Sequence, residues 1–405
     1  MRLPDPPTFA PCPITLTTLS GLRAAGVRAG IKASGNPDVG LLVADKPMPM
    51  AGVFTQNHFA AAPVLLSRKH LTLSGGMVRA MVVNSGNANA CTGERGERDA
   101  LQMAQRVAAH VGCSAHEVIV ASTGVIGHKL PMDKVLAGID ACVSELSGEE
   151  EAGRNFLAAI QTTDAFSKEA GQAVALTGGG STHVAGIAKG AGMIEPNMAT
   201  MLAFVGTDGQ ATVDELNALI GQIARRSFNA VHVDSHTSTN DMFLLFATGK
   251  TGGSTQTWSD AAMSVARRLA WLIARDGEGA TKVTTITVTG ASSDEAANLI
   301  AREVAKSALV RTALFGNDPN WGRFVSQVGN SRHVKNVVNL TCTLQGVTVF
   351  KRGEPTQFNK VDLSKKMAVD DVSLELHIGE GDGRFELMTS DLGYKYVEVN
   401  AEYTT

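Results

Sequence analysis

A threonine lies between a turn-forming stretch and an apolar segment, and its hydroxyl is a candidate nucleophile. Residues 189–200 read KGAGMIEPNMAT, and residues 201–205 read MLAFV, which is typical of a buried strand. The threonine, Thr200, is a poor nucleophile unless a base lies beside it. Cleavage between Ala199 and Thr200 would supply that base, because a free α-amino group has a pKa near ~7.7–8.0 and can accept the hydroxyl proton. The alternative is an ordinary turn before a core strand.

Three other places could complete an acyl-transfer site. Thr123 and Gly124 follow an apolar segment and could offer a hydroxyl and an unhindered backbone N–H to an oxyanion, although a threonine-glycine pair after a strand is more often a plain turn. Lys189 could face a substrate carboxylate; the alternative is a solvated lysine. Glu278 is held between two glycines, whose backbone freedom a bare surface turn would not need.

Other kinds of chemical centre have weaker support. Strand periodicity would place His232, Asp234 and His236 on one face. Side chains on one face of a strand stand about 7 Å apart, so three of them rarely converge on one metal ion. We favour a polar, hydrogen-bonded strand end there and expect no metal. Cys91 has no neighbouring histidine to activate it. The glycine-rich stretches lack the lysine of a phosphate loop and the third glycine of a dinucleotide site.

The elements that must position these residues alternate between strand and helix. Residues 77–83 predict a strand that runs into a polar loop over 84–93, followed by a helix over 98–111. Residues 118–121 predict a second strand, which leads into Thr123 and Gly124. Pro131 predicts the start of a helix that continues to about Leu146. This order favours an α/β protein with mixed sheets.

The same alternation continues to the end of the chain. The charged stretch 147–153 predicts a surface turn before a helix, and capping boxes at Thr212 to Glu215 and at Ser292 to Glu295 predict two helix starts. Residues 261–273 predict another helix. Residues 337–344 and 373–378 predict strands, and the tail 394–405 alternates at first, which predicts an ordered end.

Composition excludes several classes of protein. The chain has 405 residues, of which 44% are hydrophobic and 19% charged, and a net charge of −3 without a basic stripe, so we expect no nucleic-acid partner. Glycine is frequent, with 42 residues, and aromatic residues make up only 5%, which suits tight α/β packing. Five scattered cysteines indicate reduced thiols, and neither a signal peptide nor an apolar run of about 18 residues occurs. We therefore expect a cytoplasmic protein without a membrane segment.

Together, these stretches resemble the ornithine acetyltransferase family (glutamate N-acetyltransferases) of arginine biosynthesis. The similarity follows the family's order over essentially the whole chain and begins with the cleavage segment 189–202. It also includes 82–93 (VVNSGNANACTG), 122–127 (STGVIG), 162–164 (TTD), 237–241 (TSTND), 276–282 (DGEGATK), 316–323 (GNDPNWGR) and the tail 400–405.

The resemblance implies a layered α/β sandwich with paired mixed sheets, built from both halves of a self-cleaved precursor. Its α chain would comprise residues 1–199 and its β chain residues 200–405. Thr200 would take the acetyl group from N2-acetylornithine as an ester and pass it to glutamate by a ping-pong route, giving ornithine and N-acetylglutamate. No cofactor is implied; acetyl-CoA is a candidate co-substrate, as in bifunctional members. Two α and two β chains would assemble as a heterotetramer.

The resemblance also assigns roles to individual residues. Thr123 and Gly124 would form the oxyanion hole. The substrate would be held by Thr162, Lys189, Thr200, Glu278, Asn400 and Thr405. Thr163 is the alternative to Thr162. The side-chain chemistry suits these roles, because Lys189 can pair with a carboxylate and Glu278 with an ammonium group.

Two rival functions remain open at the level of sequence. One is an aminopeptidase or amidase that uses the same self-processed N-terminal threonine. The other is a non-catalytic protein that binds a metal or small ligand around His232 and His236. An assay of acetyl transfer and an intact-mass measurement separate these possibilities from the acetyltransferase.

Overall fold

The computed structural model describes residues 9–195 and 201–402, which form two compact units. The larger unit contains residues 9–195, 201–229 and 236–273 of this part of the chain. The smaller unit contains residues 230–235 and 274–402. Neither boundary falls at 199/200, where the precursor is expected to be cut. Among the described residues, no helix is long and apolar enough to cross a membrane.

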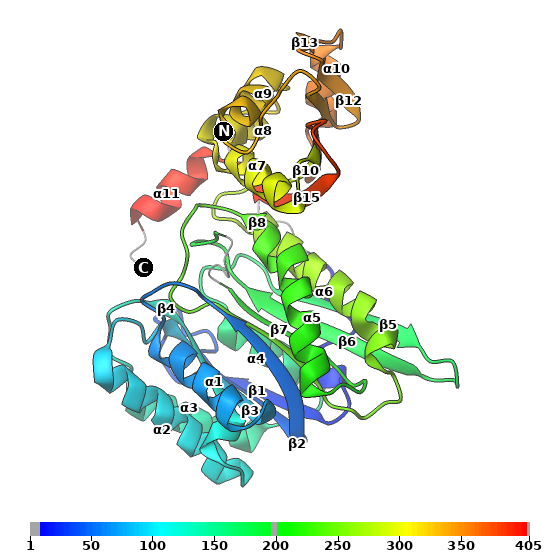
Figure 1. Cartoon of the computed structure of the whole chain (residues 1–405). Coiled ribbons are helices and arrows are strands. Elements are labelled where there is room, and N and C mark those ends of the chain that lie inside the picture. Colours follow the sequence, from blue (N-terminus) through cyan, green and yellow to red (C-terminus); the bar gives the residue numbers. More distant parts are fainter. Residues whose placement is uncertain (1–8, 196–200, 403–405) are drawn as a thin grey trace. The chain divides into compact units, whose positions relative to one another are not determined.

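A mixed sheet organises the larger unit (Figure 1). Its strand order is β4-β3-β2-β9-β7-β6-β5, with β1 paired to β2. The pairs β3–β4 and β7–β9 are parallel, and the others are antiparallel. The strands are β1 (Leu22–Val27), β2 (Val39–Phe54), β3 (Met77–Asn87), β4 (Val118–Val125), β5 (Lys168–Ala175), β6 (Ser181–Lys189), β7 (Leu202–Thr207) and β9 (Met242–Ala247). Strands β7 and β9 come from the second half of the chain, so both halves build one sheet.

Helices give the sheet of the larger unit two buried faces. Ala80 and Val82 of β3 lie in one apolar cluster, whereas Met81 and Val83 lie in another. Burial on both faces explains why β3 is a continuous apolar run without strict alternation. The helices are α1 (Ala62–Leu73), α2 (Gly93–Val111), α3 (Met132–Glu145), α4 (Glu150–Ile160), α5 (Val213–Arg226) and α6 (Thr255–Arg275), with short 3-10 turns at Leu16–Thr18, Ala115–Glu117 and Phe228–Ala230.

The smaller unit has a second mixed sheet with the strand order β13-β12-β11-β14-β10-β15-β8. Ile300 and Val304 of α7 pack into one core with Ile286 of β10 and Leu374 of β14. The strands are β8 (Val231–His232), β10 (Val283–Ala291), β11 (Thr341–Leu344), β12 (Val347–Lys351), β13 (Glu354–Pro355), β14 (Asp371–His377) and β15 (Gly383–Ser390). The helices are α7 (Asp294–Lys306), α8 (Ala308–Phe315), α9 (Trp321–Asn330), α10 (Lys360–Lys366) and α11 (Tyr394–Glu402).

The predicted fold class is confirmed: the chain is an α/β protein with two mixed sheets. Several element boundaries are confirmed as well. Thr212 is the N-cap of α5 and closes a capping box with Glu215, α3 begins directly after Pro131, and the apolar segment after Thr200 forms β7.

Other local predictions were wrong. Strand β3 continues through residues 84–87, which were expected in a loop, because buried hydrogen bonds satisfy its polar side chains. Helix α2 begins at Gly93, and α4 begins at Glu150 inside the expected surface turn. The cap of α7 is Ser293, whose hydroxyl accepts from Ala296 N. Strand β11 begins only at Thr341. The tail over 394–402 forms α11, which agrees with the ordered end that was predicted.

Candidate active site

The hairpin of β6 and β7 places Lys189 beside the strand that begins just after Thr200. Lys189 and Leu202 are antiparallel partners in the sheet, so the predicted cleavage segment is the connection between these two strands. Lys189 is only 4% exposed. Ala199 and Thr200 lie outside the described residues. Lys189 lies eleven residues before Thr200 in the sequence. In the sheet it pairs with Leu202, the second residue after Thr200.

The first described residue after Thr200 is fixed through both of its backbone groups. The Oδ1 atom of Asp241 accepts a hydrogen bond from Met201 N at 2.9 Å, and Met201 O accepts one from Met242 N at 3.0 Å. Asp241 is fully buried. Burial raises the pKa of Asp241 well above its usual range, against the opposing effects of the Met201 N–H, the Thr55 hydroxyl and the Lys189 charge. Burial therefore favours the neutral acid here more than at an ordinary aspartate.

The residue before Asp241 reaches the predicted oxyanion strand. The side-chain amide of Asn240 donates to Ala88 O at 2.6 Å and to Ser122 O at 2.8 Å. Ser122 directly precedes Thr123, and its own hydroxyl donates to Asn84 Oδ1 at 2.6 Å. Two consecutive buried side chains, Asn240 and Asp241, therefore bind the end of β4 and the start of β7.

Thr123 and Gly124 lie on β4 itself, where the strand meets β3 in a distorted register. Gly124 has a φ of +131°, and a Cβ atom there would lie 2.4 Å from the carbonyl carbon of Gly86. Only glycine allows this close approach of the two strands. Thr123 is buried. The geometry explains the glycine, while the oxyanion-hole role of both residues stays a prediction.

A buried aspartate joins the segment of Thr162 to the segment of Lys189. The Oδ2 atom of Asp164 accepts from Thr162 N at 2.9 Å, and its Oδ1 atom accepts from Gly190 N at 2.8 Å and from Lys168 Nζ at 2.6 Å. The side chains of Asp164 and Lys168 are both fully buried. Burial alone would raise the pKa of Asp164, but the charges of Lys168 and Lys189 lower it below its ordinary value, so the carboxylate stays ionised.

Glu278 and Asn400 meet within the smaller unit. The side-chain amide of Asn400, on α11, donates to Glu278 Oε2 at 2.9 Å and to Tyr396 O at 3.0 Å. Gly279 has a φ of +75°, and a Cβ atom there would lie 2.5 Å from Tyr396 N. The glycine after Glu278 therefore permits the contact between its loop and α11. Thr405, the last predicted substrate residue, lies outside the described residues.

Comparisons with known proteins show the family of this chain. A sequence model described as the ArgJ family matches residues 23–405. The chain belongs to the ArgJ family. The arginine biosynthesis bifunctional protein ArgJ of Rhodopirellula baltica is 44% identical over 398 residues, which cover 95% of this chain and 96% of that protein. The protein of the same name from Deinococcus radiodurans is 44% identical over 391 residues, covering 96% of this chain and 98% of the relative.

Two solved structures are also similar to this chain in sequence. The ornithine acetyltransferase of Mycobacterium tuberculosis, complexed with ornithine, is 41% identical and gives a TM-score of 0.40; the match covers 45% of this chain and 95% of that chain. An arginine biosynthesis bifunctional protein argJ from Bacillus halodurans is 38% identical with a TM-score of 0.43, covering 46% of this chain and 94% of that chain.

The rival metal site loses its geometric basis in this member of the ArgJ family. Strand β8 ends at His232, and Ser235 has a φ of +63°, so the alternation that would align His232, Asp234 and His236 is broken. In the part of the chain that the structure describes, no group of three or more His, Cys, Asp or Glu residues could hold a metal ion.

Sequence reasoning missed the roles of three buried side chains: Asp164, Asn240 and Asp241. They stand in the ArgJ-like segments 162–164 and 237–241, but sequence reasoning gave them no role. A signal was present for Asp241, which directly precedes the apolar strand β9, because a charged residue that is buried beside such a strand needs a hydrogen-bond partner. Their partners are backbone groups far away in sequence, which spacing does not reveal.

Proposed function

We propose that this chain is a glutamate N-acetyltransferase of arginine biosynthesis that uses Thr200 as its nucleophile. The Thr200 hydroxyl attacks the acetyl carbonyl of N2-acetylornithine, the C–N bond breaks, and ornithine leaves with the proton on its amine. The amine of glutamate then attacks the threonine ester, which returns the hydroxyl to Thr200 and releases N-acetylglutamate. Each step exchanges one acyl bond, so no cofactor is needed.

One observation carries this proposal: a family match from residue 23 to the last residue, with relatives named for arginine biosynthesis that align over almost their whole length. The position of Lys189 beside the start of β7 supports it. An ammonium group there suits the α-carboxylate that both substrates carry. Thr162 is tied to the same place through Asp164 and Gly190.

The remaining substrate roles follow the family resemblance. In this proposal Thr123 and Gly124 stabilise the oxyanion of the tetrahedral intermediate. Glu278 receives the substrate ammonium group, and Asn400 orients the Glu278 carboxylate through their hydrogen bond. Thr405 adds a hydroxyl. The assignment of Thr162 in preference to Thr163 is part of the proposal.

Self-cleavage between Ala199 and Thr200 generates the α-amino base in this proposal. The resulting α chain (1–199) and β chain (200–405) stay together, since β7 and β9 of the β chain pair with β6 and β2 of the α chain. Separating them would break an eight-stranded sheet through its centre. We further propose a cytoplasmic heterotetramer of two α and two β chains.

The test combines mass and activity. Purified protein should give two fragments that divide at Ala199/Thr200, and should convert N2-acetylornithine and glutamate into ornithine and N-acetylglutamate. The variant Thr200→Ala should remain one 42.4 kDa chain without activity. Thr207→Ala, at the far end of the same strand, is the matched control and should be cut and active. A fully active uncut protein would refute the mechanism.

A second activity is favoured by the word "bifunctional" in the names of the relatives. We propose that acetyl-CoA also donates an acetyl group to Thr200, so that the enzyme makes N-acetylglutamate from acetyl-CoA and glutamate. The measurement is product formation from these two compounds without acetylornithine. The activity should disappear in Thr200→Ala; its survival there would place the second activity elsewhere.

A further inference from the structure

Met201, the residue bonded to Thr200, is held through both of its backbone groups. Its N–H is bound by the buried carboxyl group of Asp241, and its carbonyl by the backbone of Met242. Asp241 and Met242 are consecutive, so one short segment binds both the N–H and the carbonyl group of Met201. Nothing in the family resemblance gave Asp241 a role.

We propose that Asp241 is a positioning residue for acetyl transfer, holding Thr200 in its reactive position through the Met201 N–H. This inference rests on the proposed function. Thr200 and Met201 share a peptide bond, which is planar and stiff, so fixing Met201 N restricts the carbonyl group and Cα of Thr200. A displacement of about 1 Å at a reacting atom can lower a rate about 10²-fold.

The neighbouring Asn240 gives the proposal its second anchor. Its amide holds Ser122 O and Ala88 O, beside the predicted oxyanion residues Thr123 and Gly124. Asn240 and Asp241 thus make three hydrogen bonds: one to Met201 at the start of β7, one to Ser122 on β4 and one to Ala88 beside it. These bonds fix the position of the start of β7 relative to β4.

The chemistry of the Asp241 contact predicts how substitutions behave. An oxygen that accepts from Met201 N is the essential feature, and burial favours the neutral acid. Asparagine offers the same oxygen in the same place without charge. Alanine leaves the Met201 N–H buried without this acceptor, and so frees the nucleophile strand to shift.

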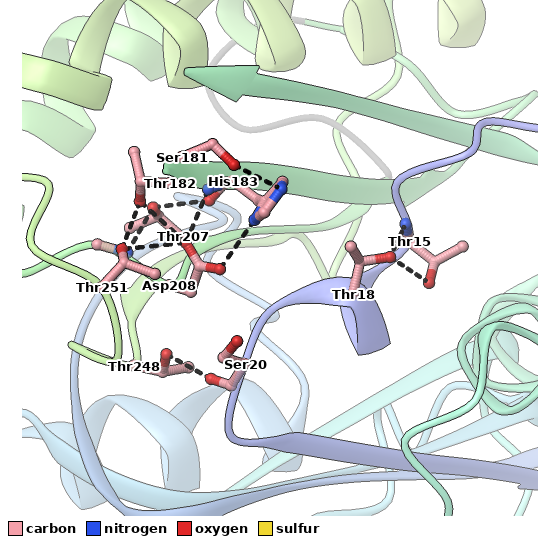
Figure 2. A network of polar contacts seen from close by, with 11 residues as sticks. Thr15, Thr18, Ser20, Ser181, Thr182, His183, Thr207, Asp208, Thr248 and Thr251 are labelled. Carbon is pink, nitrogen blue, oxygen red and sulfur yellow. Dashed lines mark hydrogen bonds and ion pairs between the residues drawn. The ribbon is translucent and has the colours of Figure 1, made fainter. Parts of the chain in front are cut away.

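Asp208 is a matched control at the other end of β7 (Figure 2). It is also fully buried. It accepts hydrogen bonds from Thr182 Oγ1 at 2.9 Å and from His183 N at 2.7 Å, and it contacts His183 Nδ1 at 3.0 Å. Asp208 therefore ties the same strand to β6 with a similar network, but away from Met201. Replacing it should lower stability without a specific effect on the reaction.

The experiment measures kcat and KM per cleaved chain for Asp241→Asn, Asp241→Ala and Asp208→Ala, after intact mass has given the cleaved fraction and thermal unfolding has shown a folded protein. We expect Asp241→Ala to lower kcat about 10²-fold or more with KM changed less than about threefold. Asp241→Asn should retain kcat within about tenfold, and Asp208→Ala should lower Tm while kcat stays near that of the wild type.

Equal kcat losses in Asp241→Ala and Asp208→Ala would overturn the proposal, as would a loss of about 10²-fold or more in a folded Asp241→Asn. The second criterion decides the matter even when Asp241→Ala does not fold. Failure of the proposed function looks different: the wild type itself would then make no N-acetylglutamate, and the positioning role would fall with it.

Discussion

Lys189 and Leu202 are direct partners across the β6–β7 hairpin, which brings a buried ammonium group beside the strand that begins after Thr200. If this ammonium binds the α-carboxylate common to both substrates, Lys189→Met should raise KM about 10- to 100-fold for N2-acetylornithine and for glutamate alike. Steady-state kinetics with each substrate varied in turn measure this.

The matched control for Lys189 is Lys250→Met, which removes a partly exposed ammonium that pairs with Asp45 at 3.4 Å. Its KM values should equal those of the wild type, since an exposed pair contributes little. A KM change confined to one substrate in Lys189→Met would contradict a shared carboxylate site.

Asp164 predicts a response of stability to acid. Its pKa is lowered in the folded state, so it contributes stability above the unfolded value of about 3.9, and this contribution is lost as pH falls through the folded pKa. Urea unfolding between pH 7 and pH 3 should therefore show a steeper fall in the free energy of unfolding for the wild type than for Asp164→Asn. Parallel curves would show that Asp164 titrates normally.

Removing the Asp164 charge also leaves Lys168 buried without its carboxylate. At pH 7 we expect Asp164→Asn to lose about 3–5 kcal/mol of the free energy of unfolding, which is typical of breaking a buried ion pair. Asp140→Asn instead breaks the exposed contacts of Asp140 with Arg106 and His110 and should cost much less. Similar losses in both variants would argue against a buried pair.

Gly124 should tolerate no side chain. Gly124→Ala places a Cβ atom 2.4 Å from the backbone of Gly86, so the strands must part, and we expect kcat to fall about 10²-fold or more if this end of β4 forms the oxyanion hole. Gly127→Ala is the matched control, because Gly127 also has positive φ, at +82°, but would have no atom within 4 Å of its Cβ. A nearly normal kcat in folded Gly124→Ala would remove it from the oxyanion hole.

Glu278 and Asn400 should act as a pair. Their hydrogen bond of 2.9 Å predicts that Glu278→Gln and Asn400→Ala each raise KM, and that the double variant is less impaired than the sum of the two, with a coupling of about 0.5–1.5 kcal/mol. The exposed pair Lys395–Glu398 on the same helix serves as the control cycle and should show no coupling in KM. If the effects of the two substitutions on KM are strictly additive, Asn400 does not orient the Glu278 carboxylate.

Much of the fold could be predicted because local physics and tertiary structure agree there. The Thr212 hydroxyl caps α5, and Pro131, whose fixed φ suits the entry into a helix, precedes α3; neither effect needs a distant segment. The tail over 394–402 was expected to be ordered, but its early alternation did not reveal a helix. Short amphipathic segments are ambiguous, and packing decides their form.

In the candidate site, too, the residues with a local chemical signal could be predicted, whereas those defined by long-range contacts could not. Residue chemistry pointed to Lys189, Glu278 and Gly124, whose types suit a carboxylate, an ammonium group and a tight backbone approach. Residue chemistry could not reveal that Asp164 accepts a hydrogen bond from Gly190 N, or that Asn240 donates one to Ser122 O. These partners lie 26 and 118 residues away in the sequence. Long-range register creates those contacts, and a single sequence does not encode register in its spacing.

An acetyl ester on Thr200 is the intermediate that distinguishes the proposed mechanism from its alternatives. Purified enzyme is mixed with N2-acetylornithine in the absence of glutamate, quenched in acid and measured by intact mass, with peptide mapping of the fragment that begins at Thr200. We expect this fragment to gain the mass of one acetyl group on Thr200, and we expect glutamate added before the quench to remove it. A fragment that stays unmodified while ornithine is formed, or an acetyl group on any other residue, would exclude Thr200 as the acetyl carrier.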